Sequence, residues 1–491
     1  MARYPVALVL VAACFATGCA SPPQRPPDDR PSVAPATQPT AALSLEGSAI
    51  QPMYREMLAV DLPTIARVAK ARGLDIQEAR QRAKAYEGRY ESSVEAVFPV
   101  IAPAFTYQHV EGANQNANGT LVLTNFNNIL PAITVQWIVN PGRVVYDIVA
   151  SKRRLEAARQ QEAASELDTL RAAAVQYYEI VLAQAKVAVA RQAVAQAEEA
   201  LRLTSRRVRT GNALAADESR ARASLAGRRQ DLLVAVNDFY QASVALSVTL
   251  DMDPTVTLVP ASGQIAQISL VREDLPVEQM LAMAVKFRPD LAVARSLVAA
   301  ARADKGAVSW GALGPQLQAA YTFGGIQTGL HGNTSALYEQ QRASAGAGFA
   351  LGPSTFGQLK TAEADFRTAA VRVERQLDAV RAQVVAAQQT SATNAALLPV
   401  AREQVAAAEE ALRLAQSNLR AGTMLLIDVL QAEDELNSAR LRYALAVAHY
   451  NQSQVNLLAA LGMLDQGSLE MLAAGEPATR PAEDRGDVIP R

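Results

Sequence analysis

Few residues in this chain of 491 amino acids have the type and spacing that catalysis or cofactor binding needs. The three histidines, His109, His331 and His449, lie at no spacing typical of metal ligands. The glycines from Gly346 to Gly352 are wrongly spaced for a dinucleotide-binding loop, and no Walker, His-Glu-x-x-His or Gly-x-Ser-x-Gly sequence occurs. The sequence therefore predicts a protein that is not an enzyme and that uses no metal and no cofactor.

Two aspartates are notable because they occupy equivalent positions 211 residues apart. Asp217 follows Gly211 by six residues, and Asp428 follows Gly422 by the same interval. A carboxylate early in a helix is stabilised by the helix dipole, and this explains both residues without any binding role.

The N-terminus predicts a removed signal peptide and a lipid anchor. Arg3 precedes an apolar stretch, Val6 to Ala16, that is too short to span a bilayer, so residues 1–18 are expected to be cleaved. The Ala-Thr-Gly-Cys sequence ending at Cys19 resembles the bacterial lipobox, which predicts acyl chains on the Cys19 thiol. An ordinary signal peptide with an incidental cysteine is the alternative. Ala20 is not the Asp that often keeps lipoproteins at the inner membrane, so this resemblance indicates the outer membrane.

Composition narrows the function classes further. With 47 basic and 48 acidic residues the chain has a net charge of −1, which disfavours a nucleic-acid partner. The Pro-rich stretch from Ser21 to Pro39 favours an extended tether. After it we find no run of about 18 apolar residues, so the sequence predicts no transmembrane helix, and strands would make any crossing of the membrane.

An internal duplication organises the rest of the chain. The seven residues Ala197–Leu203 recur unchanged as Ala408–Leu414, and the same shift of 211 continues to Leu250 and Leu461. Residues 143–210 contain no Gly or Pro and predict one long helix, with a counterpart at 358–421. A second heptad-patterned helix follows Gly211 and Gly422, so each half is expected to form a long antiparallel hairpin with a glycine at its turn.

Strand signals are confined to short windows next to these helices. Windows 100–110, 121–139, 317–326 and 343–351 are rich in β-branched, aromatic and small residues. Their partial alternation fits strands with one face toward lipid, and the strands of a soluble sandwich are the alternative. The Asn-, Gly- and Thr-rich stretches 112–128 and 325–334 are expected to be exposed loops.

From about residue 55 to 465 the chain resembles the TolC-like outer-membrane efflux protein family. Besides the duplication, the resemblance rests on motifs in a fixed order: Pro99 and Pro315 at strand entries, Arg288-Pro289-Asp290-Leu291 opening a helix, Arg209–Gly211, Arg420–Gly422, and Thr423–Ala432 with its Leu-Ile-Asp-Val-Leu run. With its predicted lipid anchor at Cys19, the chain resembles the branch of this family whose members carry an acyl anchor.

The resemblance implies a mainly α fold with a small β part. In that family three protomers assemble: each contributes four strands to a shared twelve-stranded outer-membrane β-barrel, and its long helical hairpins to a trimeric periplasmic α-barrel. The implied function is the exit duct of a tripartite efflux or secretion system in a Gram-negative bacterium. The implied partners are two further copies of the chain, outer-membrane lipid, a periplasmic adaptor protein and an inner-membrane pump.

The resemblance also assigns site residues. Asp428 matches an aspartate that lines the periplasmic gate, Asp217 is its repeat equivalent, and a ring of such carboxylates would attract cations. Met424, Gln431 and Leu419 differ from the residues that close the gate in the best-known member. The implied adaptor-docking tips are Arg209, Thr210, Gly211 and Asn212 in the first half and Arg420, Ala421, Gly422 and Thr423 in the second.

The predicted organisation has five parts: signal peptide 1–18, acylated N-terminus and tether 19–50, first repeat 51–262, second repeat 263–465 and C-terminal tail 466–491. A coiled-coil periplasmic lipoprotein scaffold without a channel is the alternative function. The strand windows argue against it, because a pure scaffold needs none. The sequence does not indicate the exported substrate.

Overall fold

The computed structural model describes residues 43–44, 56–115, 118–261, 264–271, 275–330, 333–334, 337–349, 352–421 and 423–469. All of them belong to one compact unit, Val33–Arg491. The predictions about the signal peptide, Cys19, the Pro-rich tether and Gly422 concern residues outside these ranges.

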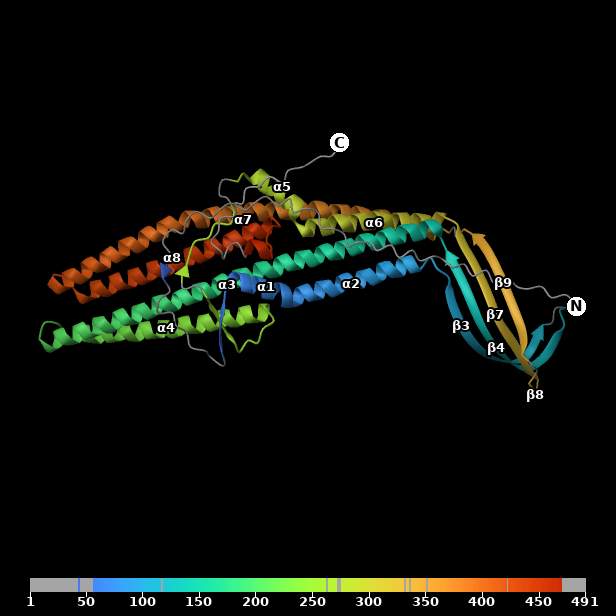
Figure 1. The fold of residues 1–491 in the computed structure, drawn as a ribbon, viewed down its shortest axis with the longest axis horizontal. Helices are drawn as coiled ribbons and strands as arrows, with labels where there is room; N and C mark the ends of the chain where they lie inside the picture. Colours follow the sequence, from blue (N-terminus) through green and yellow to red (C-terminus); the bar gives the residue numbers. More distant parts are fainter. Residues whose placement is uncertain are drawn as a thin grey trace, which may run out of the picture. The chain divides into compact units, whose positions relative to one another are not determined.

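The main elements of the two halves follow the same order: two helices, two long strands and a hairpin of two long helices (Figure 1). The first half comprises β1 (Leu43–Ser44), β2 (Met57–Val60), α1 (Leu62–Arg72), α2 (Leu74–Glu95), β3 (Val100–Gln115), β4 (Leu121–Val139), α3 (Pro141–Arg209), α4 (Ala215–Thr249) and β5 (Thr257–Pro260). The second comprises β6 (Gln264–Ile265), α5 (Val277–Phe287), α6 (Pro289–Leu313), β7 (Gln316–Leu330), β8 (Asn333–Thr334), β9 (Tyr338–Gly348), α7 (Ser354–Ala421) and α8 (Leu426–Ala460). The predicted duplication is confirmed.

The longest helix, α3, starts and stops where its sequence dictates. Asn140 caps it by accepting a hydrogen bond from the Arg143 N–H over 3.0 Å, and Pro141 occupies the first turn, where no N–H partner is lost. Its 69 residues correspond to about 100 Å at ~1.5 Å per residue. The equivalent helix α7 runs for 68 residues with Pro399 inside it. Each long helix carries its half of the chain from the sheet to a hairpin tip.

Helices pack in layers around α3, which contacts α2, α4, α6 and α8. Small residues allow close approach between α3 and α6: a Cβ on Gly306 would lie 2.6 Å from the Tyr146 ring, so only glycine fits there. The largest apolar cluster joins both halves and includes Phe239 of α4 and Tyr450 of α8, each fully buried. This cluster holds the bases of the two hairpins together.

The long strands form one antiparallel sheet in the order β3-β4-β7-β9, with the two-residue β8 beside the end of β7 (Figure 1). The strands are longer than predicted. β3 extends to Gln115 and β7 to Leu330, through Asn-, Gly- and Thr-rich stretches expected to be loops. The expectation of loops was therefore wrong for these residues. Hydrogen bonds to a neighbouring strand stabilise their extended backbone although their own β propensity is weak.

Two further features bear on the sequence predictions. The strands β2 and β5 form a small parallel pair that joins the start of the first repeat to its end, and sequence patterns gave no sign of it. Among the described helices, Ala215–Thr249 is long and apolar enough to cross a membrane by length and composition. The prediction that no helix crosses the membrane stays a prediction, because core helices of other proteins also reach this length and composition. Phe239 and Leu246 of this helix are buried in the apolar cluster, as in a core helix.

Candidate functional site

The tip of the first hairpin is a glycine turn between α3 and α4. Gly211 has φ +75°, the left-handed conformation that a side chain would strain. The Asn212 N–H donates to the Arg207 carbonyl over 2.8 Å, closing the end of α3. In the second hairpin the Thr423 N–H donates to the Asn418 carbonyl over 3.0 Å, which is the same bond shifted by 211 residues. The ends of α3 and α7 are therefore closed by equivalent backbone hydrogen bonds.

The two aspartates singled out by the sequence cap the helices that leave the tips. The Asp217 carboxylate accepts a hydrogen bond from the Leu214 N–H at 3.3 Å, and that of Asp428 accepts one from the Leu425 N–H at 3.2 Å. Both side chains are partly exposed. Asp217 also pairs with Arg220 at 3.3 Å, whereas Asp428 has no ion-pair partner within the described residues. Both aspartates lie in the first turn of their helices, where the helix dipole stabilises a carboxylate.

Ion pairs inside the hairpins repeat with the same shift. Arg229 of α4 pairs with Glu198 of α3 at 2.8 Å, and Arg440 of α8 pairs with Glu409 of α7 at 2.8 Å. Each pair connects the two helices of one hairpin, and the two pairs occupy equivalent positions in the two repeats. The duplication therefore extends from sequence to side-chain contacts.

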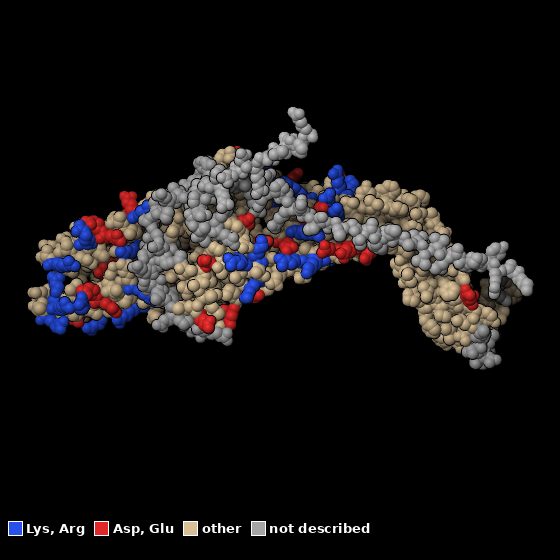
Figure 2. Space-filling view, viewed as in Figure 1, with Lys and Arg blue, Asp and Glu red and all other residues tan. Residues whose placement is uncertain are grey.

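The sheet is chemically unlike the helices. Its four long strands contain only three charged residues, Glu111, Glu339 and Arg342. Large apolar side chains on these strands lie exposed, among them Phe105 at 72% and Leu123 at 85%. Figure 2 shows the same contrast, with Lys, Arg, Asp and Glu spread over the helices and nearly absent from the sheet face in view. Such a surface is typical of strands that face lipid.

The Arg288-Pro289-Asp290 motif forms a polar clamp at the start of α6. Arg288 donates to both carboxylate oxygens of Asp290, to Gln383 of α7 at 2.7 Å and to the carbonyl of Ala460 at 3.3 Å. Burial alone would raise the pKa of Asp290, but the hydrogen bonds and charge of Arg288 outweigh it and the pKa is lowered. The motif therefore fastens α6 to the second hairpin. In the sequence, the Arg288-Pro289-Asp290 motif is distant from both hairpin tips.

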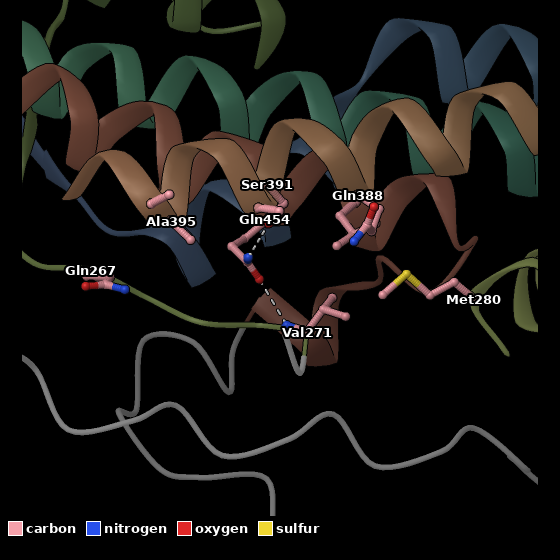
Figure 3. A pocket seen from close by; sticks show the side chains of 10 residues that line it. Gln267, Val271, Met280, Gln388, Ser391, Ala395 and Gln454 are labelled. Carbon is pink, nitrogen blue, oxygen red and sulfur yellow. Dashed lines mark hydrogen bonds between the residues drawn. The ribbon is translucent and has the colours of Figure 1, made fainter. Parts of the chain in front are cut away.

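A cavity of about 500 Å³ lies between α5, α7, α8 and the segment before α5 (Figure 3). Gln454 crosses its wall: its amide donates to the Ser391 hydroxyl over 2.7 Å and accepts from the Val271 N–H over 3.0 Å. The remaining lining is mostly Ala, Leu, Val and Met with two glutamines. Gln454 and Ser391 are engaged in joining elements, and the lining contains no acid–base pair.

The residues considered first for chemistry lie apart from one another. His109 is on β3 and bonds to Asn127, His449 is on α8, and Gly346 lies within the strand β9 rather than in a loop. His331 lies outside the described residues. Within the described ranges no group of three His, Cys, Asp or Glu side chains could hold a metal ion.

A comparison with known protein families identifies the family of this chain. A family model described as outer membrane efflux protein matches residues 65–250 and 280–463, one segment in each repeat. The chain belongs to the outer membrane efflux protein family. The predicted family and its duplicated, mainly helical fold are thus confirmed, and efflux at the outer membrane is its function.

Solved structures give the same fold. The outer-membrane channel OprN matches with a TM-score of 0.72 at 20% identity, covering 91% of this chain and 99% of the other. The CmeC outer membrane channel of Campylobacter jejuni matches with 0.70 at 15% identity, covering 91% and 98%. The open state of the MtrE channel of Neisseria gonorrhoeae matches with 0.69 at 18% identity, covering 89% and 98%. A comparison with curated protein sequences gave no match.

Proposed function

We propose that three copies of this chain form the exit duct of a tripartite efflux or secretion system. Substrates would enter from an inner-membrane pump and a periplasmic adaptor protein and leave through the outer membrane. Membership of the outer membrane efflux protein family supports the location and the export function. The trimer, the adaptor contact and the gate are the parts that the proposal adds.

The observation that carries the proposal is the charge-poor sheet with two open edges. β3 and β9 each have a neighbour on one side only among the described strands. Unpaired backbone groups are not tolerated in lipid, so a four-stranded sheet cannot stand there alone. Pairing β9 of one protomer with β3 of the next would remove both edges. Three protomers would then enclose twelve strands, and the hairpins would continue the duct into the periplasm.

The proposal assigns the two hairpin tips to the adaptor and the Asp428 carboxylates to the gate. Three copies of Asp428 around one axis would concentrate negative charge where protein walls limit screening. Asp217 would contribute less, since Arg220 already pairs with it. Cys19 would carry acyl chains at the membrane surface. A channel-free scaffold remains the alternative, but it gives the exposed apolar strands no role.

Assembly and conduction test the proposal directly. Full-length protein extracted from membranes should migrate as an SDS-resistant trimer and conduct ions in planar bilayers. A monomer, or a trimer that never conducts, would refute the exit duct and favour the scaffold.

The gate is tested in the same bilayers with a trivalent cation. Hexamminecobalt should block the wild-type channel, and Asp428→Asn should weaken that block about tenfold or more. Asp217→Asn serves as the matched variant and should change the block less. Equal block in all three proteins would remove both aspartates from the gate.

The lipid anchor has its own test. Cys19→Ser should abolish incorporation of labelled palmitate while assembled trimer remains, because the sheet supplies a second membrane contact. Labelling that persists in the Cys19→Ser protein would disprove acylation at this residue.

A further inference from the structure

We propose that the first hairpin tip docks an acidic surface of the adaptor, and that the second tip contacts the adaptor without such a charge preference. The first tip is defined as residues 202–222 and the second as its equivalent, residues 413–433. This inference rests on the proposed function, because it assumes that an adaptor docks at the tips. We expect the adaptor to present Asp or Glu side chains around its docking turn to the first tip of each protomer.

The two tips have diverged in charge although their backbones are duplicates. The first contains six arginines and two acidic residues: Arg202, Arg206, Arg207, Arg209, Arg220, Arg222, Asp217 and Glu218. The second contains two of each: Arg413, Arg420, Asp428 and Glu433. Ser417 and Asn418 replace Arg206 and Arg207. The excess of positive charge therefore belongs to the first tip alone. Figure 2 shows Lys and Arg gathered at the lower of the two hairpin ends, where Figure 1 places the end of α3 and the start of α4.

The acidic residues of the first tip are already used. Arg220 pairs with Asp217 at 3.3 Å and Arg222 with Glu218 at 3.1 Å, while Arg202 pairs with the preceding Glu199. Arg206, Arg207 and Arg209 form no ion pair within the described part of the chain, and Arg209 bonds only to the Ser205 carbonyl. Three guanidinium groups in one helical turn thus lack a carboxylate.

The helix dipole does not account for three cations. All three lie in the last turn of α3, where a positive charge is favourable. The helix α7 is almost equally long, ends in the same backbone bond and has only Arg420 in its last turn. One cation is therefore enough for such a helix end, and the two additional arginines need another explanation.

Apolar side chains complete the surface. Leu214 is 71% exposed directly after the turn, and Leu203 is 43% exposed one turn before the arginines. Exposed leucines surrounded by arginines have the composition of a protein interface, in which an apolar centre is bordered by charges. Arginine suits carboxylates in particular, because its planar group can donate two parallel hydrogen bonds. These features favour an acidic protein over a simple solvated helix end.

Charge reversal of the tip tests the inference. The probe is a disulfide-closed helical-hairpin peptide with glutamates around its turn, compared with the same peptide carrying glutamines. In low salt the glutamate peptide should bind the full-length channel, and Arg206→Glu/Arg207→Glu/Arg209→Glu should weaken binding tenfold or more. The loss should shrink at high salt, where exposed charges are screened. Helical content and trimer migration of the variant provide the folding control.

Introducing the two missing arginines into the second tip provides the complementary test, a gain of binding. Ser417→Arg/Asn418→Arg should create a second site and increase the amount of glutamate peptide bound per trimer. Equal binding of the glutamate and glutamine peptides, or no loss in the reversed variant, would overturn the inference. So would stronger binding of the tip to phosphatidylglycerol vesicles than to the glutamate peptide, since it would mark a lipid-binding surface.

Conductance separates this inference from the proposed function. The reversed variant should still form a conducting trimer in planar bilayers, because its substitutions lie outside the sheet that forms the membrane pore. A conducting trimer that binds neither peptide would reject the acidic partner and keep the exit duct. A protein that binds the glutamate peptide without conducting would reject the exit duct and keep the acidic partner.

Discussion

The hairpins α3–α4 and α7–α8 share one backbone design and differ in what fills their ends. The second has its own apolar cluster near the tip, formed by Ala408, Leu412, Ala415, Val429, Ala432, Leu436 and Ala439. In the first, the equivalents of Ala415, Val429 and Ala439 are Thr204, Glu218 and Arg228. Both hairpins thus keep the capping aspartate, but the contact between their two helices near the tip, which we call the seam, is polar in the first hairpin and apolar in the second.

The polar seam is held by directed bonds instead of burial. Ser205 of α3 donates to Glu218 of α4 at 3.1 Å, while Thr204 donates to the Ala200 carbonyl of its own helix. Arg228 leaves its own hairpin and pairs with Asp434 of α8. Net hydrogen bonds contribute about 1 kcal/mol each, whereas a buried leucine contributes about 2 kcal/mol or more. We therefore expect the second tip to be the more stable and the first to adjust more readily to a partner.

The largest expected effect comes from emptying the apolar seam. Leu412 is 6% exposed in the second tip cluster, so Leu412→Ala should destabilise that hairpin by about 2–5 kcal/mol. The repeat equivalent Leu201 is only partly buried, and Leu201→Ala should cost less. Hydrogen exchange of the tip amides, measured on assembled protein, compares the two. Equal acceleration at both tips would contradict the proposed difference in seam stability.

Sequence reasoning reached the duplication, the hairpins and the family because these depend on local patterns. The repeated Ala-Glu-Glu-Ala-Leu-Arg-Leu segment predicts two equivalent helices, and the ion pairs Arg202–Glu199 and Arg413–Glu410 follow from i, i+3 spacing on them. Strand lengths were underestimated, because pairing with a neighbour decides where a Gly- or Asn-rich strand ends. No local pattern identifies a partner in the other repeat, so the Arg228–Asp434 pair and the burial of Glu433 were not predicted.

A smaller effect is expected from pH at Glu433, whose repeat equivalent is the exposed Arg222. Glu433 is 7% exposed; this burial raises its pKa, and the nearby charge of Arg228 offsets the rise only in part. Because the folded pKa exceeds the unfolded one, protonated Glu433 stabilises the fold below its unfolded pKa. That contribution is lost as the pH rises through the folded pKa.

Glu433→Gln should therefore raise the apparent melting temperature at neutral pH and make little difference near pH 4. Circular dichroism melts of both proteins across this range measure the change. Arg222→Gln is the matched variant at the equivalent position, and it should give no such pH-dependent gain. A constant difference between wild type and Glu433→Gln at all pH values would show that Glu433 does not titrate as proposed.

The smallest expected effect concerns the one ion pair that the described residues form between the two hairpins. The Asp434 side chain is 60% exposed while that of Arg228 is 22% exposed, so water screens much of their attraction and the coupling should stay below about 1 kcal/mol. A double-mutant cycle with Arg228→Gln and Asp434→Asn, followed by thermal unfolding, isolates this energy from the other contacts of each residue. Arg228 also pairs with Asp231 of its own helix, so Arg228→Gln alone should cost more than Asp434→Asn alone. If the single substitutions are simply additive, the hairpins are joined by their shared apolar cluster and not by this pair.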